Sequence, residues 1–166
     1  DLTRDQARLR FDNVTVAKND ILAQPGTAPD VLASAMPAIL TLLAADICGA
    51  AEWQLQTTVE YAKIRTQFDR PIALFQSVKH PIVEMMVQID RARSLVYAAA
   101  CSLDSQHEDA DRLARMAKAA ASDTADFCSG RSFQLHGGIG FTWQCYLHIS
   151  FIRQLYCRIA IGSAHF

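Results

Sequence analysis

The sequence predicts an all-α protein, an up-and-down bundle of four helices preceded by the remnant of a β-domain. Three observations lead to this prediction. Apolar residues recur three or four positions apart over long segments, short breaks containing Pro or Gly separate these segments, and a strand-like pattern is confined to the beginning. Because 51% of the 166 residues are hydrophobic, the chain can fill the core of one domain.

The beginning of the chain, residues 1–23, has the period-two pattern of strands rather than the helical pattern. Leu9 and Phe11 alternate with arginines, and after the turn-like pair Asp12–Asn13 the valines of "VTV" alternate with a threonine. One or two strands are marginally stable alone. We therefore interpret this segment as the end of a β-domain, and residues 24–30, "QPGTAPD", as a linker.

The four helices are expected within residues 31–166, which form the bundle. The first should start at about residue 29, where a proline suits the opening turn, and run to about residue 65, with Pro37 bending it or marking its true beginning. The second follows the break "RTQFDRPIALF", with Pro81 in its opening turns. Its apolar stripe comprises Val78, Ile82, Met85, Ile89, Ala92, Val96 and Leu103.

The third and fourth helices are expected at about residues 109–135 and 146–161, and Gly162 is a suitable stop for the fourth. The middle of the third helix is rich in alanine, which allows close helix approach. Its apolar side carries Leu113, Ala117, Ala120, Thr124, Phe127 and Leu135. Short loops between four helices favour the up-and-down arrangement.

Composition argues against several classes of function. The 16 basic and 17 acidic residues give a net charge of -1 and include no basic run, so nucleic acid is not an expected partner. The longest apolar runs fall far short of the roughly 20 residues that span a bilayer, and no signal peptide opens the chain, so we expect no membrane partner and a cytoplasmic location. Five widely spaced cysteines without a C-x-x-C pair indicate neither disulfides nor a metal site.

Two stretches interrupt the helical pattern: "YAKIRTQFDRPIALFQSVKH", residues 61–80, and "FQLHGGIGFTW", residues 133–143. Together they resemble the C-terminal helical domain of the acyl-CoA dehydrogenases, flavoenzymes that desaturate acyl-CoA thioesters. That family has an Arg-x-x-Phe stretch at the end of the first helix, a Gln opening the second, and a Gln-x-x-Gly-Gly-x-Gly-Phe loop between the third and fourth. The matching residues are Arg65, Phe68, Gln76, Gln134, Gly137, Gly138, Gly140 and Phe141. "RLRFDNVTVA" similarly resembles the last strands of the family's middle β-domain.

The resemblance implies flavin adenine dinucleotide (FAD) as cofactor, bound across a subunit interface. It assigns Arg65 to the pyrophosphate, because the guanidinium matches phosphate oxygens in pairs. Glycines would let the backbone approach the ligand, with the loop completing the cradle from another chain. The implied FAD-binding residues are Arg65, Gln67, Phe68, Phe75, Gln76, Gln134, His136, Gly137 and Gly138.

Each of these residues also has a plainer interpretation. Arg65 suits an exposed helix end, where its charge favours the helix dipole. Phe68 and Phe75 could belong to the core, and a Gly-Gly pair could simply end a helix. His136 could be a hydrogen-bonded structural histidine.

The sequence departs from the family at the catalytic carboxylate, which removes the α-proton while flavin accepts the β-hydride. Most members carry it near the end of this domain, but "LYCRIAIGSAHF" contains no acid. Other members carry it early in the first helix, where this chain has Ile39 and Leu40. Asp46 lies about two turns further on, roughly 10 Å away, and is expected to be exposed or paired. We therefore assign no catalytic residue.

The stretch after the glycine loop resembles an actinobacterial subgroup of the family. Trp143, His148 and Arg153 match its pattern, whereas Gln144 and Cys145 depart from it. The resemblance implies a base-lacking subunit in the β-oxidation of fatty acids or steroid side chains. The implied partners are an acyl-CoA substrate, further dehydrogenase subunits in a homo- or hetero-tetramer, and electron-transfer flavoprotein.

Three alternatives stay open. The chain could belong to a conventional dehydrogenase whose base is Asp46 or lies in domains outside these residues. It could be a structural assembly subunit without flavin, or a flavin oxidase or monooxygenase on the same scaffold. In every case the isolated chain is expected to be inactive, since the family's other domains enclose the flavin ring and the acyl chain.

Overall fold

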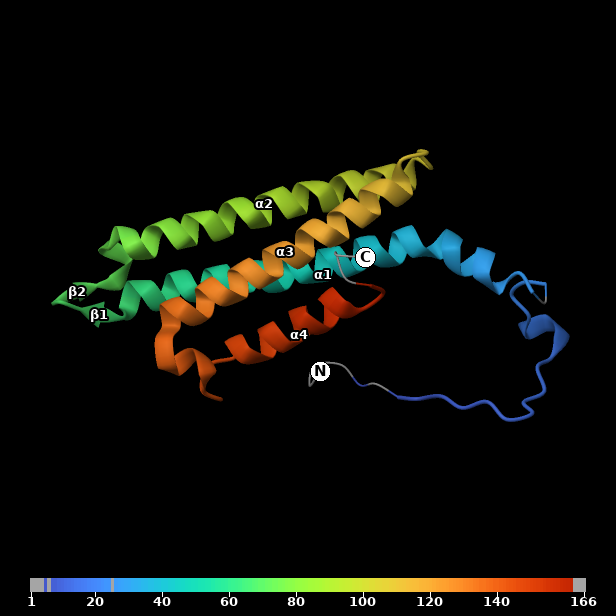
Figure 1. Ribbon diagram of the computed structural model, residues 1–166, viewed down its shortest axis with the longest axis horizontal. Helices are drawn as coiled ribbons and strands as arrows, with labels where there is room; N and C mark the ends of the chain where they lie inside the picture. The colour runs from blue at the N-terminus through green and yellow to red at the C-terminus, as the bar shows by residue number, and fades with distance from the viewer. Residues whose placement is uncertain (1–4, 6, 25, 163–166) are drawn as a thin grey trace.

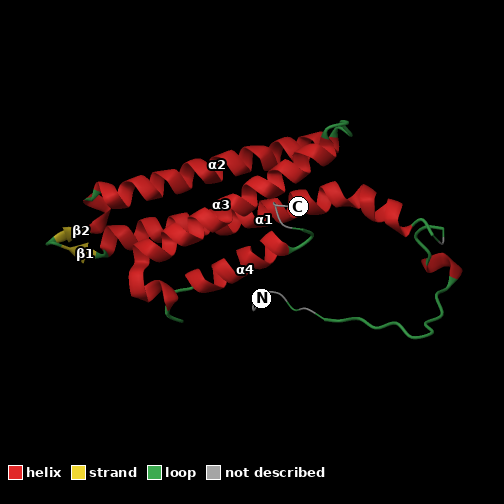
Figure 2. Ribbon diagram, viewed as in Figure 1, coloured by secondary structure: helices red, strands yellow, loops and turns green. Residues whose placement is uncertain are grey.

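Four long helices dominate the computed structural model, which describes residues 5, 7–24 and 26–162 (Figure 1). The prediction of an all-α, four-helix bundle is confirmed. Figure 2 shows that the remainder of the described chain is mainly loop. The helices are α1 (Ala28–Ile64), α2 (Gln76–Asp104), α3 (Ala110–His136) and α4 (Leu147–Ile159).

The helix ends follow local chemistry closely. Pro29 lies in the first turn of α1, where its missing N–H group costs nothing. The helix continues through Pro37, so this proline neither starts nor ends it. Pro81 lies in the second turn of α2. After α4, Gly162 has a φ of 101°, a conformation that favours glycine and stops the helix.

The strand-like segment at the beginning forms no strand among its described residues. Leu9 and Phe11 are about three-quarters exposed, and the chain there runs away from the bundle (Figure 1). A strand needs a hydrogen-bonded partner, and none of the described residues supplies one. The assignment of residues 1–23 to a β-domain stays a prediction, and residues 1–4 and 6 lie outside the described part.

One short antiparallel pair does occur, at a place where no strand was predicted. β1 (Thr66–Gln67) pairs with β2 (Arg70–Pro71) immediately after α1, with Thr66 opposite Pro71 and Gln67 opposite Arg70. A short 3-10 turn, Ile72–Leu74, then leads into α2. The break between the first two helices is therefore a hairpin.

Small side chains bring α3 close to its neighbours. Its alanines at positions 114, 117, 121 and 125 are all fully or almost fully buried, at the three- and four-residue spacing of one helix face. They pack with Leu40 and Ile47 of α1 and with Ala92 of α2. Toward the other end of the bundle, a second cluster joins α1, α2 and α3 around Met85, Ile89 and Cys128.

Buried polar side chains also cross the bundle. The amide of Gln54 in α1 donates to the hydroxyl of Ser129 in α3 at 3.2 Å, and that hydroxyl donates to the side-chain oxygen of Gln154 in α4 at 2.6 Å. Nearby, the hydroxyls of Thr58 and Ser132 lie 2.8 Å apart. Because buried polar groups need partners, these contacts favour one alignment of α1, α3 and α4.

By length and composition, α1 is apolar enough to cross a membrane: an 18-residue window has a mean hydropathy of 2.0, and 33% of it is buried. The core helix of a globular protein meets the same criterion. Here α1 buries Leu40, Ala44 and Ile47 in the bundle core. The expectation of no membrane partner stays a prediction.

Candidate functional site

The residues predicted to bind FAD lie at one end of the bundle. There α1 ends, α2 begins, and α3 leads into the 3-10 turn η3 (Gly137–Phe141) (Figure 1). The two motifs, some 70 positions apart in the sequence, meet where the ring of Tyr61 stacks on that of His136. Of the predicted residues, Phe75 is half-buried, His136 is buried, and the others are exposed: Arg65, Gln67, Phe68, Gln76, Gln134, Gly137 and Gly138.

Within one chain, the end of α1 that carries Arg65 and the glycine loop after α3 lie at the same end of the bundle, where Tyr61 contacts His136. The expectation that the loop completes the cradle for FAD from another chain stays a prediction. Arg65 is exposed and forms no ion pair with any other residue that the structure describes, which leaves its guanidinium available to an anion.

Beside Arg65, the tip of the β1–β2 hairpin has an unusual backbone. Phe68 and Asp69 have φ values of 53° and 60°, the left-handed conformations of a tight two-residue turn, where Asn-Gly is the usual choice. A bulky residue there costs roughly 1–2 kcal/mol. Phe68 is 84% exposed, and its ring packs edge-on with the ring of Phe75. The guanidinium of Arg70 lies over the Phe75 ring, 4.7 Å from its centroid.

The three glycines of the loop differ in whether the fold requires glycine at their position. Gly137 has a φ of 62°, which favours glycine, and its N–H group donates to the carbonyl of Phe133. A Cβ at Gly140 would lie 3.2 Å from the Cβ of His136. Gly138 has an ordinary φ and open space around it. Folding does not require glycine at position 138, which fits a place where a ligand approaches the backbone.

The side chain of His136 lies inside the bundle. Its Nδ1 donates to the carbonyl of Ser132 at 2.9 Å, and its ring stacks on Tyr61 with centroids 4.3 Å apart. Burial lowers the pKa of this imidazole below its usual value, which favours the neutral form. The plainer interpretation of His136 as a structural histidine therefore suits its side chain. Only its backbone adjoins the exposed glycines.

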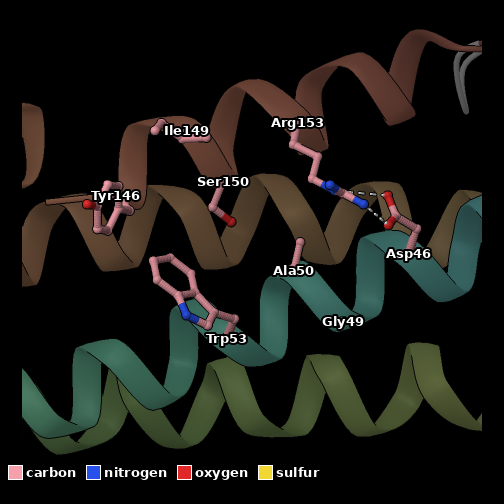
Figure 3. Close-up of a pocket in the computed structure, with 8 residues that line it drawn as sticks. All are labelled: Asp46, Gly49, Ala50, Trp53, Tyr146, Ile149, Ser150 and Arg153. Carbon is pink, nitrogen blue, oxygen red and sulfur yellow. Dashed lines mark hydrogen bonds and ion pairs between the residues drawn. The ribbon is translucent and has the colours of Figure 1, made fainter. Parts of the chain in front are cut away.

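A pocket of about 400 Å³ lies between α1 and α4 (Figure 3). Its rim carries the rings of Trp53 and Tyr146, and the buried hydroxyl of Ser150 has no hydrogen-bond partner among the described residues. Sequence reasoning missed this pocket, because it depends on how closely two helices about a hundred residues apart approach. The lining residues are Asp46, Gly49, Ala50, Trp53, Tyr146, Ile149, Ser150 and Arg153.

Asp46, the alternative catalytic base, is held at the edge of this pocket. Arg153 contacts both carboxylate oxygens, with Nη2 at 2.5 Å from Oδ1 and Nε at 3.3 Å from Oδ2. The thiol of Cys157 donates to Oδ2 at 3.3 Å. Hydrogen bonding to Asp46 raises the pKa of Arg153, so this arginine keeps its charge. A carboxylate held by a permanent cation is a poor proton acceptor.

The two places where the family carries its base contain apolar residues or lie partly outside the described chain. In α1, Leu40 is buried in the core and Ile39 is half-buried. The last acid of the sequence, Asp126, forms an ion pair with Arg158. Residues 163–166 of the terminal stretch lie outside the described residues. Within the described part, no three His, Cys, Asp or Glu side chains gather to hold a metal ion.

Comparison with known proteins identifies the family. A profile described as "Acyl-CoA dehydrogenase, C-terminal domain" matches residues 40–164. The chain is 45% identical over 123 residues to acyl-CoA dehydrogenase IpdE2 of Mycobacterium tuberculosis, covering 74% of this chain and 35% of that protein. It is 39% identical over 129 residues to FadE34 of the same organism, covering 76% and 17%. The chain thus spans about a third or less of the length of these relatives.

Solved structures agree with the sequence matches. An FAD-dependent dehydrogenase is similar with a TM-score of 0.86 and 30% identity, covering 93% of this chain and 42% of that one. A chain from a structure of the electron transferring flavoprotein of Acidaminococcus fermentans has a TM-score of 0.89 and 29% identity, covering 93% and 40%. The steroid ACAD Tcur3481-Tcur3483 has a TM-score of 0.79 and 30% identity, covering 82% and 38%. The chain therefore belongs to the acyl-CoA dehydrogenase family, and its four-helix bundle is the C-terminal domain of that family.

Proposed function

We propose that this chain is part of an FAD-dependent acyl-CoA dehydrogenase subunit, that its bundle end binds FAD across a subunit interface, and that the subunit lacks its own catalytic carboxylate. The observation that carries the FAD site is that the end of α1, which carries Arg65, and the glycine loop lie at one end of the bundle, joined by the Tyr61–His136 contact. At this end the fold itself does not require glycine at position 138. The similarity to an FAD-dependent dehydrogenase supports the same cofactor.

Bound FAD would supply the hydride acceptor, while the residues of this chain bind and orient it. The guanidinium of Arg65 would hold phosphate oxygens with two parallel N–H groups. Gln134 and Gln76 would offer amide donors and acceptors, and the missing Cβ of Gly138 would let the backbone approach. The exposed ring of Phe68 would bury its apolar face against the dinucleotide, which would offset the strain of its turn.

The absence of a base is the second part of the proposal. Neither family position for the carboxylate holds an acid in the sequence, and Arg153 and Cys157 both contact Asp46. Another subunit type would then remove the α-proton, and the double name of the similar steroid ACAD supports a heteromeric assembly. An acyl-CoA substrate, bulky or straight-chain, a tetrameric assembly, electron-transfer flavoprotein as electron acceptor and a cytoplasmic location complete the proposal. The similar chain from the flavoprotein structure supports that acceptor.

The test is to purify the whole protein alone and with candidate partner dehydrogenase subunits, and to measure FAD per subunit and turnover. We expect FAD to bind and turnover to require the partner, on steroid-like or straight-chain acyl-CoA thioesters. Arg65→Ala should weaken FAD binding about 10- to 100-fold, as expected for hydrogen bonds to a charged group worth about 1.5–3 kcal/mol. Arg65→Lys should recover only part of the loss, because lysine cannot form the paired contact.

Arg91→Ala is the matched control, since Arg91 is exposed in the middle of α2, away from this end. A colourless purified complex would indicate the structural assembly subunit instead. Turnover by this subunit alone would contradict the absence of a base. Rapid oxygen consumption by the reduced protein would indicate an oxidase or monooxygenase.

A further inference from the structure

Tyr61 makes the contact that joins the two halves of the FAD-binding end. Its ring stacks on His136 with centroids 4.3 Å apart and an interplanar angle of 21°. Its hydroxyl donates to the carbonyl of His136 at 3.4 Å, a long hydrogen bond. The ring contact is therefore the stronger part of this pair.

Tyr61 and His136 each lie next to a part of the proposed FAD site in the sequence. Tyr61 lies one helical turn before Arg65, whose N–H group donates to the Tyr61 carbonyl at 2.9 Å. His136 directly precedes Gly137, the first residue of the glycine loop. A shift of His136 relative to Tyr61 would thus move the loop relative to the arginine.

Ser132 and Gly140 also contact His136 and help to keep it beside Tyr61. Its Nδ1 donates to the Ser132 carbonyl, and the Ser132 hydroxyl pairs with that of Thr58, one turn before Tyr61 on α1. The loop also folds back onto His136, because Gly140 approaches its Cβ so closely that an added methyl group would lie 3.2 Å away. Gly137 and Gly138 are exposed, and they lie between His136 and Gly140 in the sequence.

We propose that Tyr61 is a positioning residue, which sets the glycine loop at the distance from Arg65 that the diphosphate of FAD requires. The inference rests on the proposed function, because it takes FAD as the ligand of this end. It adds a residue that none of the sequence motifs assigned to the cofactor. Tyr61 acts through His136 and does not itself touch the ligand.

The experiment compares three variants of the whole protein. Tyr61→Leu removes the ring, Tyr61→Phe keeps the ring and removes only the long hydrogen bond, and Tyr97→Leu is the control, because Tyr97 is 66% exposed on α2. Three quantities are measured: the Kd for FAD by titration of the apoprotein, the Tm of the apoprotein, and amide hydrogen exchange of peptides covering residues 133–141 without FAD. The exchange reports on the loop independently of the cofactor.

We expect Tyr61→Leu to weaken FAD binding by about threefold to tenfold, the range that an aromatic pair supplies. We expect faster exchange at Gly137–Phe141 in the same variant, with the exchange of α2 unchanged. Tyr61→Phe should stay close to the wild type in all three measurements, as should Tyr97→Leu. A loss of affinity that only followed a lower Tm would indicate a general packing role and overturn the proposal.

Unchanged loop exchange in Tyr61→Leu would also overturn it. A wild-type protein that fails to bind FAD would contradict the proposed function, and this inference as a statement about FAD would fail with it. In that case the exchange data would separately decide whether Tyr61 fixes the loop. The two failures are therefore distinguishable.

Discussion

At the scale of single residues, the two acid–base side chains discussed above, Asp46 and His136, both have partners within the protein. Asp46 has an arginine and a thiol as partners. The buried ring of His136 is stacked and hydrogen-bonded. Of the residues proposed to bind FAD, the exposed ones are an arginine, a phenylalanine, glutamines and glycines, none of which transfers protons at neutral pH.

The pairing of Asp46 predicts the outcome of Asp46→Asn. The substitution leaves Arg153 without its counter-charge at a half-buried site, so we expect the free energy of unfolding to fall by about 1–3 kcal/mol, between the values for exposed and fully buried pairs. Urea unfolding measures this fall, with the exposed Asp123→Asn in α3 as control. We expect the turnover of the folded complex to stay within about threefold, whereas loss of a general base would cost 10²–10⁴-fold.

The depressed pKa of His136 predicts a pH dependence of stability with a definite sign. In the unfolded chain this imidazole takes up a proton near pH 6.5, whereas burial delays protonation in the folded chain to lower pH. The unfolded state thus binds more protons as the pH falls from about 7 to 5, and stability decreases over that window. His136→Gln should flatten this decrease in urea unfolding at several pH values. An unchanged slope in His136→Gln would contradict the assignment of this pH dependence to His136.

At the scale of elements, α4 and the glycine loop depend on contacts from other helices. α4 has 13 residues and no side-chain cap at its first turn. At its end, the Nζ of the buried Lys118 in α3 donates to the carbonyls of Arg158 at 2.6 Å and Gly162 at 3.1 Å. The terminal carbonyls of a helix need such donors. Burial lowers the pKa of Lys118, and these two acceptors give it polar surroundings.

Replacing this donor should loosen the end of α4. For Lys118→Met we expect a loss of about 1–2 kcal/mol in unfolding free energy, since a basic group that caps a partly buried helix end contributes about that much. Hydrogen exchange should speed up over residues 155–162 and stay constant in α2. Lys63→Met is the control, at an exposed lysine near the end of α1. Unchanged exchange in α4 would show that the cap has no stabilising role.

The glycine loop predicts opposite results for two neighbouring substitutions. Gly140→Ala places a methyl group 3.2–3.3 Å from His136 and Phe133, so we expect a loss of about 1–3 kcal/mol, as in other overpacked sites. Gly138→Ala enters open space and should change stability by less than about 0.5 kcal/mol. It should nevertheless weaken FAD binding, measured by titration. If Gly138→Ala bound FAD like the wild type, the backbone approach at this position would be refuted.

At the scale of the whole molecule, the described surface exposes many large apolar side chains. On α2 they include Val83, Met86, Val87 and Tyr97, between 47% and 66% exposed, and Leu42 on α1 is 71% exposed. Large apolar side chains gathered on the exposed face of a helix are typical of contacts with other protein. A bundle that covers these faces only through association is consistent with the oligomers expected of the family.

This surface predicts that the 166-residue chain associates in solution. Sedimentation velocity should show a mass that grows with protein concentration, because burying these side chains removes apolar area from water. Val87→Glu should shift the equilibrium toward the monomer. Gln106→Glu adds the same charge in the loop between α2 and α3 and should not. A monomer at every concentration would mean that these faces are stable in water.

The helices were predictable because their period is set by neighbouring residues. Each predicted span agrees with the structure within a few residues, apart from the undecided effect of Pro37. The hairpin after α1 escaped prediction, because its strands have two residues each and Phe68 adopts a turn conformation that its side chain disfavours. The strand-like beginning shows the converse, since a local pattern cannot supply the missing partner strand.

For the site, the local motifs were predictable from the sequence, whereas contacts between distant residues were not. The motifs placed Arg65 and the glycine loop correctly at helix ends, and the family's topology brought them together. The other contacts join residues far apart in the sequence. Tyr61 and His136 are 75 positions apart, and Asp46 and Arg153 are 107 positions apart. The pocket likewise lies between α1 and α4. No local pattern in a single sequence specifies which of the four tyrosines or which arginine will contact such a partner.

The chain of hydrogen bonds from Gln54 through Ser129 to Gln154 has a consequence far from its own location. If one of these helices slid along its axis by a turn, the buried amide and hydroxyl groups would lose their hydrogen-bond partners, which is costly. These hydrogen bonds therefore favour one axial alignment of α1, α3 and α4. Arg65 lies 11 residues beyond Gln54, about 16 Å along the axis. If this end binds FAD as proposed, hydrogen bonds in the middle of the bundle thus help to fix the position of Arg65 without touching the ligand.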